Sequence, residues 1–368
     1  MKRIMACFLA LVLAFCTVGA MAAGRENKLV VGSTTALSGN FFSPAFGSNT
    51  SDLDVQTLLH GYHLVKWNGD EGSYVLNDRV VTSLVKTEDS QGNRTYTLTL
   101  CEDLRYSDGT PITARDYAFS ILLNASAQMA EIGGAADGGA CLLGAADYKD
   151  GAKALKGVRV LNDSHLAITV SAEYRPFFYE LGLLDYAPYP ISVIAPGCQV
   201  KDDGEGAYID GAFTADVLRG TMLDAQTGYV THPSVVSGMY TLVSYDGAQA
   251  EFELNRNYKL AERDTVPIKR IVFKTVSNDT MIDELKNGTV DLLTKVTSAS
   301  AVEQGNKLPY AYAKVSYPRT GLSMISFCCE SSAGSSQAVR QAIAYCTDRD
   351  AIVSSYVGAN GQRVDCLL

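Results

Sequence analysis

The sequence contains little tryptophan, little histidine and no excess of positive charge. Its 368 residues include one Trp and four His, and the formal net charge is −9. A protein that binds nucleic acid needs a basic surface to neutralise phosphates, so this balance argues against such a partner. The negative charge favours solubility and carries no information about the fold.

Motifs of several enzyme classes are also missing. No glycine-rich loop runs into Lys-Ser or Lys-Thr to hold phosphates, and neither a Gly-x-Ser-x-Gly elbow nor a His-Glu-x-x-His motif occurs. The sequence has no Cys-x-x-Cys pair, which disfavours a structural zinc site. We therefore predict that the chain is not an enzyme, and we assign it no catalytic residue, no cofactor and no metal.

Long hydrophobic runs are absent apart from the first residues, which have the features of a secretory signal. Lys2 and Arg3 precede an apolar run to Phe15, and Ala20-Met21-Ala22 fits a small-residue cleavage site. The run is shorter than the roughly 20 residues of a transmembrane helix. We predict a signal peptide over residues 1–22 and secretion of the remainder.

The nine cysteines suggest a second reading of that signal. Acylation of Cys16 would make the chain a lipoprotein, but the large Phe15 before it disfavours this site. We expect most of the other cysteines to be small buried residues, and the adjacent Cys328 and Cys329 to alternate in and out of a sheet. These other cysteines are Cys101, Cys141, Cys198, Cys328, Cys329, Cys346 and Cys366.

Two polar clusters have some features of metal sites. His60 and His63 have a spacing that two ligands on one helix could use, but Gly61 between them indicates a helix end and no third ligand is near. The acidic run at 202–205 lacks the alternating ligands of a calcium loop. We favour a solvated acidic loop within an irregular segment, 188–211.

Local patterns predict a mixture of helices and strands. Residues 28–32 form an apolar strand, Asp52 caps a helix, and Thr113 with Asp116 marks the start of another helix. Hairpins turn at 162–163 and at Asp246-Gly247. From residue 268 strands and helices alternate, with helix starts at 277–278, Ser336 and Asp348, which indicates an α/β domain. We place the domain boundary at 265/266.

Several segments resemble one family, the bacterial extracellular solute-binding proteins of family 5, which serve ABC importers for oligopeptides, dipeptides and nickel. The most specific match is LRYSDGTPITARDYAFS at 104–120. Further matches keep the family's order: 58–65, 235–242, 254–258, 284–292 and 339–352. Two positions depart from the family pattern, since Met239 replaces a proline and Lys259 replaces a tryptophan.

The resemblance implies an α/β fold of two lobes, of the periplasmic-binding-protein type known as class II or cluster C. Lobe I would span 23–265, and a partial lobe II would span 266–368. Family members continue well beyond the length reached here, so the second lobe is expected to be incomplete. The acidic residue that pairs with a peptide's amino terminus in the family would fall outside the sequence.

The resemblance also implies a binding site. In lobe I the loop after the first strand lines the family's cleft, and exposed aromatic rings there would suit a ligand wall. In lobe II an arginine could pair with a ligand carboxylate. The predicted contacts are Asn40, Phe41, Phe42, Gly47, Ser48, Asn49, Tyr317, Arg319 and Thr320. For the aromatics, the alternative is burial in the core beneath the loop, and for Arg319 it is a solvated surface position.

The expected function follows from the family. The chain would be the monomeric binding component of an ABC importer, secreted across the bacterial inner membrane into the periplasm or to the outer cell surface. It would capture oligopeptides between its lobes and deliver them to membrane permease subunits, with a separate ATPase driving transport. A secreted hydrolase and a peptide-sensing adaptor without a transport role are the alternatives.

Overall fold

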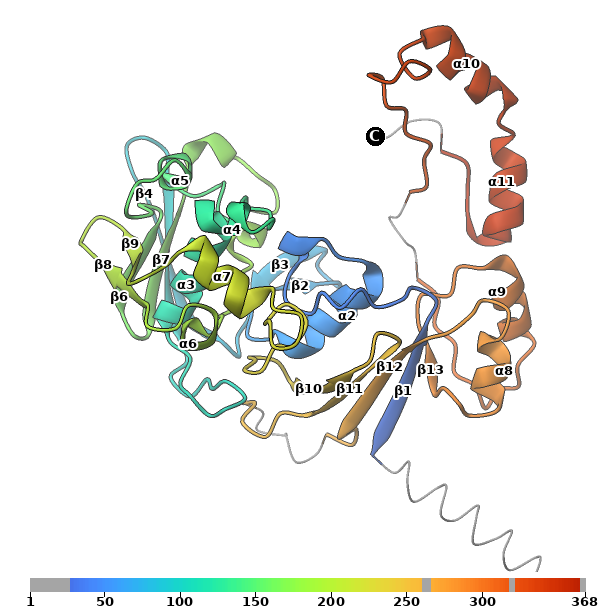
Figure 1. Ribbon diagram of the computed structural model, residues 1–368, viewed down its shortest axis with the longest axis horizontal. Coiled ribbons are helices and arrows are strands. Elements are labelled where there is room, and N and C mark those ends of the chain that lie inside the picture. Colours follow the sequence, from blue (N-terminus) through green and yellow to red (C-terminus); the bar gives the residue numbers. More distant parts are fainter. Residues whose placement is uncertain (1–26, 260–265, 318–321, 365–368) are drawn as a thin grey trace, which may run out of the picture. The chain divides into compact units, whose positions relative to one another are not determined.

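Two compact units make up the chain (Figure 1). The structure, a computed structural model, describes residues 27–259, 266–317 and 322–364. Unit 1 comprises the chain up to residue 31 together with 35–275, and unit 2 comprises 32–34 and 276–368. The observed boundary at 275/276 lies about ten residues after the expected one at 265/266. The difference is due to the strand β12 (Arg270–Thr275), which pairs with β11 and so belongs to unit 1. Both units mix helices and strands, and the predicted α/β class is confirmed.

The larger core of unit 1 is built on an antiparallel sheet with the strand order β4-β5-β7-β6. Helix α3 (Ala114–Ala125) packs against β6 and β7 and against the small β8–β9 hairpin. The turn between β6 and β7 falls at 163–164, next to the predicted position. The strands are β4 (Val81–Glu88), β5 (Arg94–Leu100), β6 (Val158–Asn162), β7 (His165–Val170), β8 (Gln199–Asp202) and β9 (Ala207–Asp210).

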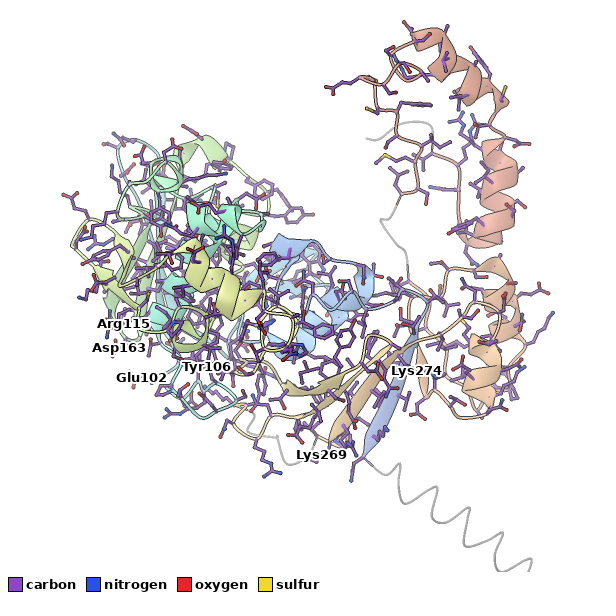
Figure 2. All side chains as sticks on the ribbon, in the orientation of Figure 1. Glu102, Tyr106, Arg115, Asp163, Lys269 and Lys274 are labelled. Atoms are coloured by element: carbon purple, nitrogen blue, oxygen red, sulfur yellow. The ribbon has the colours of Figure 1, made fainter. Side chains whose placement is uncertain are left out.

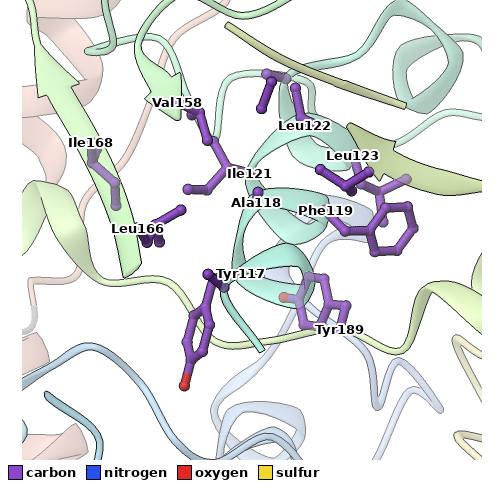
Figure 3. Packing of buried hydrophobic residues seen from close by; sticks show 14 of the residues in the cluster. Tyr117, Ala118, Phe119, Ile121, Leu122, Leu123, Val158, Leu166, Ile168 and Tyr189 are labelled. Carbon is purple, nitrogen blue, oxygen red and sulfur yellow. The ribbon is translucent and has the colours of Figure 1, made fainter. Parts of the chain in front are cut away.

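Helix α3 begins as its sequence predicts. The Thr113 hydroxyl accepts from the Arg115 amide at 3.2 Å, and the Asp116 carboxylate accepts from the Thr113 amide at 2.8 Å. Arg115 points outward to Asp163 in the β6–β7 turn, 3.2 Å away (Figure 2). Ten of the twelve helix residues are buried, so almost the whole circumference of α3 faces protein. Figure 3 shows Phe119 and its neighbours filling this core.

A second sheet of unit 1 follows the order β10-β11-β12-β1. Its buried face packs on helix α2 (Thr50–Leu59) through Val31, Phe252 and Phe273. The predicted strand at 28–32 and the hairpin at Asp246-Gly247 are confirmed. The strands are β1 (Lys28–Ser33), β10 (Tyr240–Tyr245), β11 (Gln249–Leu254) and β12.

The start of α2 differs from the prediction by one turn. Asn49, not Asp52, is the N-cap, and its side chain accepts from the amides of Ser51 and Asp52. Asp52 lies at the third helical position and accepts in return from the Asn49 amide, which completes a capping box. Both residues suit a cap, so sequence alone does not separate them.

Two glycines bring the end of α2 against the start of β10. The Gly238 amide donates to the Leu59 carbonyl at 2.7 Å, and Ser237 bonds both the amide and the carbonyl of Gly61. A Cβ on Gly61 would lie 3.0 Å from the Ser237 carbonyl, and one on Gly238 would collide with the carbonyl of Leu58. The close approach of these two backbones requires glycine at both positions.

The segment 188–211 is more regular than expected. It contains α6 (Ile191–Ile194) and the β8–β9 hairpin, and Asp202 at the end of β8 accepts from Arg159 Nε at 2.9 Å. The prediction of an irregular surface is therefore wrong. The other elements of unit 1 are β2 (Val65–Asn68), β3 (Ser73–Leu76), α4 (Ala127–Glu131), α5 (Ala145–Lys149), α7 (Ala215–Met222) and the 3-10 turns η1 (Pro44–Phe46), η2 (Ala172–Tyr174) and η3 (Glu180–Leu184).

Unit 2 contains short helices with little burial. The predicted caps Ser336 and Asp348 are confirmed, but α8 is capped by Thr280 and not at 277–278. Helices α10 and α11 contain no buried residue. The elements are α8 (Met281–Lys286), β13 (Leu292–Leu293), α9 (Ala299–Asn306), α10 (Gln337–Cys346), α11 (Arg349–Tyr356) and η5 (Gly358–Asn360).

The cysteines behave differently from the expectation. Cys198 is buried, Cys101 and Cys141 are half-buried, and the other described cysteines are exposed. Cys328 and Cys329 lie outside any strand, so the predicted alternation across a sheet is wrong. Cys16 and Cys366 lie outside the described residues. Among the residues that are described, no helix is both long and apolar enough to cross a bilayer.

Candidate ligand-binding site

The loop between β1 and α2, residues 38–49, is organised by Asn40. Its side-chain amide donates to the carbonyls of Ser43, at 2.7 Å, and Gly47. Its carbonyl oxygen accepts from the Phe42 amide at 3.2 Å, and Gln56 donates to the Asn40 backbone carbonyl at 2.9 Å. Asn40 is buried and shapes the loop, and its contact with a ligand stays a prediction.

The two phenylalanines of this loop point into the protein. Phe41 is fully buried and meets the edge of Tyr245 with ring centroids 4.8 Å apart. Phe42 is equally buried and packs against the rings of His60, Tyr189 and Tyr229. The expectation of exposed rings is therefore wrong, and the rings stabilise the loop from below. Ligand contact through the backbone of these residues stays a prediction.

The loop reaches the surface at Gly47 and Ser48, which are both exposed. Gly47 has a φ of 79°, and no atom lies within 4 Å of the position that a Cβ would take. Asn49 is half-buried and holds the start of α2, while its side-chain amide donates to the Ala36 carbonyl at 2.9 Å. Gly47 and Ser48 are thus the most exposed of the predicted residues of this loop, and ligand contact at these two residues and at Asn49 stays a prediction.

Of the three ligand contacts predicted in unit 2, the structure describes only Tyr317. Tyr317 is 66% exposed, as a ligand contact requires. Arg319 and Thr320 lie outside the described residues. The role of all three stays a prediction.

Unit 1 contains a shallow, open pocket of about 320 Å³ close to this loop. The Ala135 amide, two positions before the lining residue Asp137, donates to the Ala45 carbonyl of the loop at 2.7 Å. The Tyr186 hydroxyl donates to the Gly138 carbonyl at 2.9 Å and holds the pocket's two main segments together. The lining residues are Asp137, Gly138, Ala140, Cys141, Tyr174, Gly182, Leu183, Asp185 and Tyr186.

Carboxylates determine the charge of the pocket. Burial raises the pKa values of the Tyr186 hydroxyl and the Cys141 thiol, so both groups are neutral. Asp137 and Asp185 lie on opposite segments, and Asp185 Oδ1 is 2.6 Å from His63 Nδ1. Neither Lys nor Arg occurs among the residues described as lining the pocket.

This pocket is not among the sites that the sequence predicts. Its first lining segment belongs to a glycine-rich loop, residues 133–144. The pocket forms because that loop meets the segment after η3, more than forty positions later, through Tyr186. The available signal was the density of Gly next to Asp137, since loops on a rigid scaffold often bind ligands.

The histidine pair does not form a metal site in this structure. His60 is buried, its Nε2 lies 2.8 Å from the Phe41 carbonyl, and burial lowers its pKa to about 4. The His63 side chain is partly exposed and bonds Asp185. Across the described residues, no group of three or more His, Cys, Asp or Glu side chains is arranged to hold a metal ion.

Comparison with known proteins gives a family and a fold. A model described as "Bacterial extracellular solute-binding proteins, family 5 Middle" matches residues 79–365. A search of curated protein sequences gave no match.

Solved structures resemble the chain over much of its length. Haemophilus influenzae OppA, in complex with RPPGFSPFR, is 20% identical with a TM-score of 0.56, covering 77% of this chain and 48% of its own. Campylobacter jejuni NikZ, in complex with Ni(L-His), is 18% identical with a TM-score of 0.56, covering 89% and 55%. A periplasmic oligopeptide-binding protein from Borrelia burgdorferi is 18% identical with a TM-score of 0.64, covering 90% and 59%. The chain thus spans about half the length of these proteins, and the likeness shows a shared fold.

Proposed function

The chain belongs to the family-5 bacterial extracellular solute-binding proteins, and from that premise we propose that it captures oligopeptides for an ABC importer. Its partners would be a peptide ligand, membrane permease subunits and a separate ATPase. It would act as a secreted monomer. The family consists of binding proteins, and the proposed role requires no covalent chemistry.

The observation that carries this proposal is the family match over residues 79–365. That range contains both segments of the pocket and the whole of α3. The solved structures with this fold include proteins described with bound peptides, such as the Haemophilus influenzae OppA complex. A pocket lined by backbone, tyrosines and carboxylates also offers the mixture of apolar and polar contacts that a peptide needs.

We propose that the ligand lies against the surface end of the loop 38–49 and against the pocket of unit 1. The bond from Ala135 to the Ala45 carbonyl keeps these two features in a fixed relation within that unit. Enclosure between two lobes stays a prediction from the family. In proteins that work this way, ligand stabilises the closed state because contacts from both lobes exist only there.

Ligand-dependent stabilisation of the full chain tests the proposal. A ligand that binds only the folded state raises the free energy of unfolding, by about 2.7 kcal/mol at a ligand concentration 100 times the Kd. The melting temperature rises with it. We expect mixtures of short peptides to raise the melting temperature and mass spectrometry to recover the bound peptides uncleaved. The Ni(L-His) complex and a set of sugars are the comparison ligands. Stabilisation by one of these and by no peptide would refute the peptide assignment, and cleaved peptides would favour the hydrolase.

A further inference from the structure

Two carboxylates line the pocket of unit 1, and neither Lys nor Arg occurs among the residues described as lining it. Asp137 approaches from the segment 137–141, and Asp185 from the segment after η3. Arg175, which is next in sequence to the lining residue Tyr174, is already engaged by Glu88 at 2.9 Å and Glu180 at 3.2 Å. Its charge is therefore compensated outside the pocket.

We propose that this pocket takes the cationic side chain, Lys or Arg, of a bound peptide. The inference rests on the proposed function and narrows it to a class of substrate. It assigns Asp137 and Asp185 as the residues that select this class.

The size and lining of the pocket fit one long side chain. Its volume of about 320 Å³ is at the lower end of ligand pockets, which run from roughly 300 to 1,000 Å³. Lys and Arg bury their apolar stems and leave the charge at the tip, so Leu183 and the ring of Tyr174 can contact the stem. An aromatic face also attracts a cation directly.

The remaining polar groups favour the same ligand. The Tyr186 hydroxyl already donates to Gly138, and the Cys141 thiol is neutral, so neither offers positive charge to an anionic side chain. Asp185 bonds His63 through Oδ1, which leaves Oδ2 as a second acceptor on the same carboxylate. A peptide glutamate placed here would meet two like charges and lose its water.

Binding of defined peptides to the full chain tests the inference. The probes are pentapeptides of alanine with one Lys, Gln or Glu at each position in turn, with free and with acetylated amino termini. Titration calorimetry should give the order Lys, then Gln, then Glu at one position, with steps of about three- to fivefold in Kd, as expected for partly exposed charge pairs. The Lys preference should weaken as salt is raised.

Matched variants locate the effect. D137N and D185N keep the shape of each side chain and should each reduce the Lys-over-Gln preference by about three- to fivefold, as measured by the ratio of the two Kd values for each variant. D163N is the control, because it also removes one negative charge from unit 1 but lies far from the pocket. Asp163 is in the turn before β7, and the lining residue Cys141 lies beside the other end of that strand. The six residues of β7 span roughly 20 Å, which exceeds the Debye length of roughly 8 Å.

The outcomes separate this inference from the function on which it rests. If pentapeptides bind but Lys and Glu are equivalent and D137N and D185N change nothing, the pocket inference is wrong and the peptide function stands. If acetylation of the amino terminus abolishes the effect of both variants, the carboxylates hold the terminal ammonium and the side-chain assignment fails. If the folded chain, checked by circular dichroism, binds none of the peptides, both proposals fail.

Discussion

Helix α3 of unit 1 and helix α10 of unit 2 begin in the same way and differ in what surrounds them. Each starts at a hydroxyl, Thr113 or Ser336, that accepts a backbone amide of the first turn. Ten of the twelve residues of α3 are buried, and none of α10 is. A cap decides where a helix begins, while a core decides how much its residues contribute to stability.

The largest expected difference concerns side chains on the two helices. Phe119→Ala on α3 removes a fully buried ring and should lower the free energy of unfolding by about 3–5 kcal/mol. Ile343→Ala on α10 removes an exposed side chain and should change it by less than about 0.5 kcal/mol. Urea unfolding followed by circular dichroism measures both values. Equal losses would mean that α10 is packed in solution.

Burial should also give unit 1 a dependence on pH through His60. Its pKa is about 4 when folded, because burial disfavours the cation, and about 6.5 when unfolded. The unfolded state therefore binds more protons between these values, and stability is lost as the pH falls from 6.5 to 4, by about 3 kcal/mol. Unfolding curves of the parent and of His60→Gln at pH 7 and pH 4.5 measure this loss as the change in the difference between the two proteins.

A matched pair of histidine variants sharpens this prediction. Because Asp116 titrates with the opposite sign in nearly the same range, the effect of His60 is read from the difference in stability between variant and parent. This difference should change by about 3 kcal/mol between pH 7 and pH 4 for His60→Gln, whereas His63→Gln, which changes a partly exposed side chain, should retain the parent's pH dependence. The opposite pattern would place the responsible titration at the surface.

Asp116 should act with the opposite sign in nearly the same window. Burial raises its pKa to about 6, above the unfolded value of about 3.8, so the folded state holds the extra proton. The corresponding stability is fully present below pH 3.8 and is lost as the pH rises through 6, by about 3 kcal/mol. Asp116→Asn should remove this loss, so the difference between variant and parent should grow from pH 4 to pH 7. A constant difference would show that Asp116 is ionised throughout.

The smallest expected effects come from the caps. Thr113→Ala and Ser336→Ala each remove one side-chain acceptor, at a cost of about 1 kcal/mol to the helix. Because α3 is packed, the first change should lower the global stability of unit 1. The second should increase hydrogen exchange in α10 alone, without moving the main unfolding transition. A global effect of Ser336→Ala would contradict the contrast between the two helices.

The sequence predicted those structural features, such as helix caps and turns, that depend on residues close together in the chain. The capping box of Thr113 and Asp116 and the turn at Asp246-Gly247 involve residues within a few positions, so their patterns are visible in the chain. The family resemblance added the fold class, since residues 104–120 form a long and specific match.

Sequence failed where the outcome depends on distant partners. An aromatic residue in a polar loop can face solvent or the core, and Phe42 is buried because Tyr189 and Tyr229 supply a cavity for its ring. The pocket likewise needs Tyr186 to reach Gly138. No sequence pattern in either segment indicates these long-range contacts. The sequence therefore predicted the loop 38–49 of the candidate site and not the pocket.

The contact between Gly61 and Gly238 has a consequence for the order of folding. The backbone at Gly61 is satisfied by Ser237, a partner 176 positions later in the chain. During synthesis, the first of these segments emerges long before the second. Helix α2 can therefore form early but cannot dock until nearly all of unit 1 is available, and such long-range closures slow the folding of a domain. A pause in chain delivery before position 238 would prolong the time during which the apolar face of α2 is open to other proteins.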